Sequence, residues 1–134
     1  MIDIENEVFT AVSKKLKKAY PKAYFTGEYV KAPPSFPCVS LIEKNNLCYE
    51  RTQTGEQQEN HSLLLYEADV YSNRQSGKKA ECKAIAALID GVMASLGFTR
   101  VFFEPIPNEL DATVFRIKAR YRAVVSKDKV IYRR

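Results

Sequence analysis

The sequence is poor in the residues on which most catalytic, metal and phosphate sites depend. Its 134 residues include no tryptophan, one histidine, three cysteines and five glycines. Cys38, Cys48, Cys82 and His61 never stand at a local ligand spacing, so no zinc site is expected. The glycines form neither GxGxxG nor GxxxxGK[ST], which leaves no phosphate loop. We therefore predict neither a metal nor a cofactor.

Candidates for acid–base or nucleophilic catalysis are few. His61 follows Asn60 in a polar stretch, where we expect a solvent-exposed imidazole rather than the partner of a nucleophilic cysteine. Glu67 and Asp69 share one face of a predicted strand and could form an acid–base pair. We favour them as partners of neighbouring arginines, because opposite charges across strands stabilise a sheet by about 0.2–1 kcal/mol each. We predict that the protein is not an enzyme.

Long apolar runs are absent as well. No segment approaches the roughly 20 apolar residues of a membrane span, and the opening MIDIENE lacks the apolar core of a secretion signal. The odd number of cysteines fits reduced, partly buried thiols in the cytosol. With 46% hydrophobic and 28% charged residues, the composition predicts one globular domain over residues 1–134.

The hydrophobic periodicity predicts two helices and five strands. The helices are expected at 3–20 and 77–96, and the strands at 23–26, 38–43, 63–72, 99–104 and 112–125. This order predicts an α+β domain, with a mainly antiparallel sheet of about four to five strands and two helices packed on one face. The second face of the sheet is then expected to be exposed.

Local signals set the expected helix ends. Asp3 can cap the first helix, and Lys14, Lys15, Lys17 and Lys18 suit its negative end better than they suit a nucleic-acid patch. Ser76 can cap the second helix, and Gly97 stands where a left-handed residue ends it. The core stripe expected on this helix repeats every four residues, at Ala80, Ala84, Leu88, Val92 and Leu96, and it is widened by Ile85, Ala87, Ile89 and Met93.

Two segments are expected outside the regular framework. Residues 44–61 are polar and too long for an ordinary loop, so they could be a hairpin extension, an arm reaching a neighbouring subunit, or a disordered excursion. We favour a protruding arm, because Leu47, Cys48 and Tyr49 give it apolar side chains to dock. Residues 126–134 are expected as a basic C-terminal tail.

The net charge of +5 is concentrated late in the chain. Residues 1–60 hold equal numbers of acidic and basic residues, and after Asp111 the only acid is Asp128. The strand at 112–125 alternates apolar residues with a basic stripe: Arg116, Lys118, Arg120 and Arg122. Such a stripe could be a phosphate track, a solvated sheet face or a salt-bridge surface between subunits.

Four segments resemble the small tail-completion or "minor capsid" proteins of phage and prophage structural operons. They are MIDIENEVFTAV, GEYVKAPPSFPCVSLIE, the run from Tyr66 to Arg100 (YEADVYSNRQSGKKAECKAIAALIDGVMASLGFTR), and the ending ATVFRIKARYRAVVSKDKVIYRR. The resemblance spans nearly the whole chain, and the order of elements is similar to that of tail terminator proteins of long-tailed phages.

The resemblance implies a structural virion protein with an α+β fold and no catalytic residues. Such proteins form hexameric rings that cap the tail tube and mediate head–tail attachment. The implied partners are further copies of the chain, the tail tube protein and a head-completion or connector protein, with DNA passing through the lumen without specific binding. The implied location is the virion, assembled in the host cytoplasm, with no membrane partner.

A ring needs two different surfaces that meet head to tail, and the arm and the basic stripe are our candidates. The stripe could instead line the lumen. We expect the apolar and acidic residues of one arm to meet the stripe of the next subunit; these arm residues are Leu47, Tyr49, Glu50, Glu56 and Glu59. The alternative is a nucleic-acid-binding module that uses the same basic strand face, whose affinity would fall steeply with salt.

Overall fold

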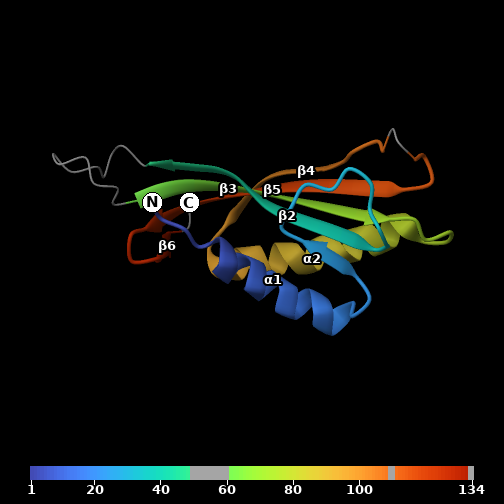
Figure 1. Cartoon of the computed structure of the whole chain (residues 1–134), viewed down its shortest axis with the longest axis horizontal. Coiled ribbons are helices and arrows are strands. Elements are labelled where there is room, and N and C mark those ends of the chain that lie inside the picture. Colours follow the sequence, from blue (N-terminus) through green and yellow to red (C-terminus); the bar gives the residue numbers. More distant parts are fainter. Residues whose placement is uncertain (49–60, 109–110, 133–134) are drawn as a thin grey trace.

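Both helices lie on one face of a single twisted sheet (Figure 1). The computed structural model describes residues 1–48, 61–108 and 111–132. The chain runs α1 (Glu5–Ala19), β1 (Tyr24–Thr26), β2 (Cys38–Cys48), β3 (His61–Ser72), α2 (Lys78–Leu96), β4 (Thr99–Pro105), β5 (Phe115–Ser126) and β6 (Ile131–Tyr132). The α+β class and the one-sided helix layer predicted from the sequence are confirmed.

The strands follow the order β1-β2-β3-β5-β4, and the short β6 lies beside the end of β5. Every pair is antiparallel except β1 with β2. Because β3 and β4 both pair antiparallel with β5, they run parallel to each other, and α2 connects them across the helix-covered face. This is a split β-α-β unit, with β5 inserted between its two strands.

Alternation along β3 and β5 separates the two faces of the sheet. Tyr66 lies opposite Tyr121 and Ala68 opposite Ala119, and all four side chains are buried towards the helices. A slip of one residue would turn this apolar set away from the core, so the core itself specifies the register.

Helix α1 packs a single apolar stripe on the core: Val8, Val12 and Leu16. Its first turn carries Glu5 and Glu7, and its last turn carries two lysines. The helix dipole favours this arrangement, because the N-terminal end is positive and the C-terminal end negative. The Asp3 carboxylate accepts a hydrogen bond from the Glu5 N–H at 3.0 Å. Ile4 nevertheless occupies the cap position without a side-chain cap, so the expected Asp3 cap is one residue out of place.

Helix α2 corrects two expectations. Gly77 holds the cap position with φ 85° and no side-chain cap, so the assignment of Ser76 is wrong. Ala80 and Ala84 are exposed, because a strict spacing of four drifts by roughly 40° per step around a helix. The buried face uses spacings of three and four instead: Cys82, Ile85, Ala86, Ile89, Val92 and Met93. Gly97 ends the helix with φ 101°, as predicted.

The connection between β1 and β2 crosses the helix-free face of the sheet near one end (Figure 1). Val30 and Phe36 from this connection pack on Cys38 and Tyr71, which are buried. The Tyr71 hydroxyl also donates to the Val30 carbonyl oxygen at 3.4 Å. The expectation that the second face is exposed is therefore wrong at this end.

Both ends of the polar stretch 44–61 lie in the antiparallel strand pair β2–β3. β2 continues to Cys48, and Leu47 lies opposite Leu63. Residues 49–60 are outside the described part of the chain. His61 is the half-buried first residue of β3, opposite Ser126, so the expected solvent-exposed loop histidine is wrong.

Residues 126–132, expected to form part of a basic tail, turn back onto the domain. β6 pairs with β5, and Ile131 packs against the core beside Gly97. The Lys129 ammonium lies 3.1 Å from a carboxylate oxygen of Glu7 on α1. The last two residues lie outside the described chain.

Candidate interaction surface

The four cations of β5 lie on the helix-free face, where the alternation places them, but they differ in exposure. The side chains of Arg116 and Lys118 are 17% and 18% exposed, and that of Arg120 is 41% exposed. Arg122 is exposed. The first three of these cations are paired with two carboxylates on the neighbouring strand β3.

Glu67 is the centre of the larger ion cluster. Its carboxylate, 6% exposed, lies 3.0 Å from Arg120 Nε, 3.4 Å from Lys118 Nζ and 3.8 Å from Lys44 Nζ. The three cations come from β5 and β2, so Glu67 joins the three strands at the middle of the sheet. The stacking of the Arg120 guanidinium 4.8 Å over the Phe102 ring fixes it further.

Asp69 forms a second pair two residues along β3. One carboxylate oxygen accepts from both Nη2 and Nε of Arg116, at 2.9 and 3.0 Å. The Arg116 guanidinium also lies 5.1 Å over the ring of Tyr71. Arg116 is therefore held by a carboxylate and an aromatic face of its own chain.

The two carboxylates respond differently to this environment. Burial works to raise the pKa of Glu67, but the hydrogen bond from Arg120 and the attraction of Lys118 and Lys44 hold that pKa below its usual range. Burial dominates at Asp69, whose pKa is raised although Arg116 and Lys118 oppose the change. Glu67 is thus the firmly ionised anchor of the network.

Three of the four cations are therefore compensated inside the chain. A phosphate would have to displace Glu67 or Asp69 from these cations, and both acids are buried. This geometry favours a structural ion network over a phosphate track. Arg122 is the exception, since it makes no ion pair with any residue in the described part of the chain, and it lies between Leu65 and Thr99.

Beside Arg122, the end of the β2–β3 hairpin carries apolar side chains on the same face. Leu47 is 55% exposed and lies opposite the half-buried Leu63, which lies opposite Val124. Leu47 and Arg122 thus share one surface, as the interface hypothesis requires. We call it the hairpin-end surface: Leu47, Leu63, Leu65 and Arg122. The other predicted interface residues lie outside the described chain: Tyr49, Glu50, Glu56 and Glu59.

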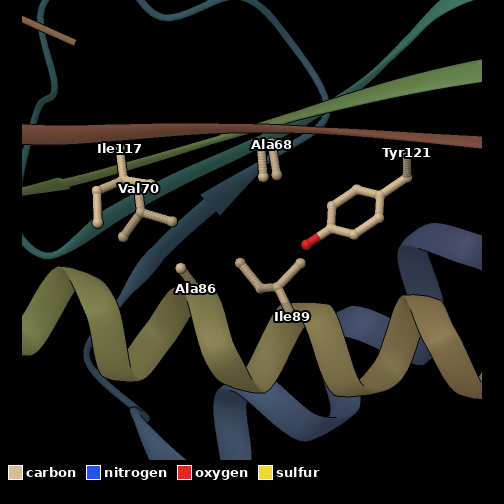
Figure 2. Close-up of a pocket in the computed structure, with 7 residues that line it drawn as sticks. Ala68, Val70, Ala86, Ile89, Ile117 and Tyr121 are labelled. Atoms are coloured by element: carbon tan, nitrogen blue, oxygen red, sulfur yellow. The ribbon is translucent and has the colours of Figure 1, made fainter. Parts of the chain in front are cut away.

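The space between α2 and the sheet is apolar. Figure 2 shows an apolar space between α2 and the sheet, too small to admit a water molecule, with Tyr121 lying across it. The Tyr121 hydroxyl donates to Asp90 at 3.1 Å. Cys38 and Cys82 are fully buried, and burial raises the pKa of their thiols to about 11 and about 12, which keeps them protonated.

Within residues 1–48, 61–108 and 111–132, no three His, Cys, Asp or Glu side chains gather closely enough to hold a metal ion. In the same part of the chain, neither helix has the length and apolar character that crossing a membrane requires.

Comparison with known proteins adds no assignment. No protein-family model matches the chain, and no curated protein matches it in sequence.

Sequence reasoning missed the surfaces at the two edges of the sheet. The segment TRVFFE indicated only a strand, yet β4 is an edge strand with Val101 and Phe103 exposed. An edge position depends on strand order, which the local pattern does not contain. Alternation in this segment reports only which sheet face each side chain takes, so it gives no signal of an edge position.

Proposed function

We propose that the chain is a structural subunit of a phage or prophage virion: a ring-forming tail terminator or head–tail joining protein. Two findings support this proposal. The sequence resemblance spans nearly the whole chain, and the α+β fold agrees with what that resemblance implies. The observation that carries it is the hairpin-end surface, where exposed Leu47 shares one sheet face with Arg122, which has no ion pair within the described residues.

In this proposal, copies of the chain close into a ring, a hexamer by analogy with the resembling proteins. One side of the ring caps the tail tube protein, and the other receives a head-completion or connector protein. DNA passes through the lumen without specific binding, which fits a chain whose β5 cations are mostly held by its own carboxylates. Assembly takes place in the host cytoplasm, and the mature location is the virion.

The hairpin-end surface is assigned to the contact between neighbouring copies. Its apolar part would bury the exposed Leu47, and Arg122 would pair with an acid of the neighbouring arm. Arg116, Lys118 and Arg120 support this surface by fixing β5 against β3 rather than by reaching the neighbour. The arm residues expected to take part are Tyr49, Glu50, Glu56 and Glu59.

Charge reversal at Arg122 tests this assignment with little risk to the fold, because its side chain is exposed. Reversal at Arg120 would break the pair with Glu67 and confuse assembly with stability. We expect Arg122→Glu to leave a folded chain that no longer forms rings, as measured by sedimentation velocity and negative-stain electron microscopy. The matched control is Lys83→Glu on exposed α2, which should assemble normally. Normal rings in Arg122→Glu would remove this surface from the contact.

A further inference from the structure

The edge of the sheet formed by β4 presents an apolar and cationic surface. Val101 is 45% exposed and Phe103 is 37% exposed. Val101 is the extra residue of a bulge between Arg100 and Phe102, a feature that redirects a side chain at a sheet edge. The Arg100 guanidinium lies 5.3 Å over the Phe103 ring and 3.2 Å from Asp90 of α2, so Arg100 and Phe103 lie on the helix side of this edge.

The opposite edge, at β1, holds an open groove of about 380 Å³ beside the start of α1. Phe9 and Phe25 line it as a stacked pair, with ring centroids 4.3 Å apart. Gly27 keeps this pair accessible, since a Cβ there would lie 3.4 Å from the Phe9 ring. Two exposed carboxylates, Glu5 and Glu28, stand at the groove.

These two surfaces are complementary in both polarity and charge. The β4 edge offers apolar side chains with the cation Arg100, whose ion pair with Asp90 is itself partly exposed, and the groove offers aromatic rings with two anions. Both lie on the side of the sheet that carries the helices, since one involves Asp90 of α2 and the other lies beside α1. A second copy placed edge to edge would therefore continue both layers, sheet beside sheet and helices beside helices.

We propose that the β4 edge of one copy docks into the α1–β1 groove of the next copy. Val101 and Phe103 cover the Phe9–Phe25 pair, and the positive charge at Arg100 faces the carboxylates of the groove. The bulge and Pro105 disfavour a continuous strand ladder between copies, so the contact is made by side chains. The contact joins two different surfaces, so it can repeat from copy to copy around a ring. The closure of these contacts into a ring rests on the proposed function.

A matched pair of substitutions at Val101 tests the contact. Val101→Asp brings a third negative charge to the groove, whereas Val101→Lys brings a complementary positive charge at the same exposed position. We expect Val101→Asp to raise the concentration needed for assembly by about tenfold or more, and Val101→Lys to assemble close to the unmodified chain. Sedimentation velocity gives the assembly state, and circular dichroism with urea unfolding confirms that each variant is folded.

Charge exchange across the contact gives the stricter test. Glu28→Lys alone should weaken assembly, but an equimolar mixture of Val101→Asp and Glu28→Lys chains should restore it. In a ring that alternates the two variants, half of the contacts place the Val101→Asp side chain of one chain against the Glu28→Lys side chain of the next, and the other half join two unmodified surfaces. Such a ring closes when it has an even number of subunits. Restoration in the mixture supports the contact.

The remaining outcomes separate this inference from the proposed function. If the unmodified chain forms rings but both Val101 variants assemble equally well or equally poorly, or the mixture shows no rescue, the edge contact is wrong and the ring survives. If the unmodified chain forms no ring at any concentration, the proposed function fails and the edge contact fails with it.

Discussion

Replacing Glu67 with glutamine removes the charge at the centre of the sheet and keeps the shape of the side chain. Unit charges 4 Å apart interact by about 4 kcal/mol at an effective dielectric constant near 20. Removing one partner of a fully buried pair costs about 3–5 kcal/mol. The side chains of Lys44 and Arg120 are 48% and 41% exposed, so water compensates part of the loss. We expect Glu67→Gln to lower the free energy of unfolding by about 2–3 kcal/mol.

Urea unfolding at low and high salt measures this loss, which should shrink as salt screens the unpaired cations. The control is Glu104→Gln, the same substitution at an exposed acid opposite Lys118 on the same face. It should change the free energy of unfolding by no more than about 0.5 kcal/mol. A Glu67→Gln variant as stable as this control would refute the reasoning that Glu67 anchors the cations.

Three further predictions concern the backbone, the thiols and the phenols. Gly97→Ala should lower the free energy of unfolding by about 1–3 kcal/mol, because φ is +101° and the new Cβ would lie 2.9 Å from Ile131. The control is Gly91→Ala, which has open space around it and should leave the free energy of unfolding unchanged or raise it; urea unfolding measures both variants. A thiol reagent should modify only the exposed Cys48 until the chain unfolds, and fast reaction of all three thiols would contradict the burial. Burial raises the pKa of the Tyr66, Tyr71 and Tyr121 phenols, so the unfolded chain loses these protons at a lower pH than the folded chain does. The free energy of unfolding should therefore fall as pH rises above about 10, and phenolate absorbance during an alkaline titration measures the ionisation.

The sequence was most informative where a period of two runs through a long strand. Ile117 and Tyr121 on β5 could be assigned to the core because each alternates with cationic neighbours, and Leu64 and Tyr66 on β3 follow from the same period of two, opposite Glu67 and Asp69. The pairing of Glu67 with cations of β5 was also within reach, since opposite charges on neighbouring strands attract.

The features that sequence reasoning missed depend on contacts between distant residues. The spacing of four on α2 put Ala80 and Ala84 in the core together with Ile85 and Ile89, but the sheet buries only the face that contains the two isoleucines. The covering of Tyr71 by Val30 requires knowing where the β1–β2 connection passes. The exposure of Val101 requires knowing that β4 is an edge strand. Each of these follows from strand order rather than from local pattern.

The central claim is that the chain assembles into a ring, and the solution mass of the unmodified protein tests it most directly. Light scattering across a wide concentration range, at low and high salt, distinguishes a closed ring from open association. The account predicts one discrete species of six subunits that persists on dilution, with a central hole in electron micrographs. A single-chain mass at every concentration, together with DNA binding that weakens steeply as salt rises, would contradict it and favour a nucleic-acid-binding module.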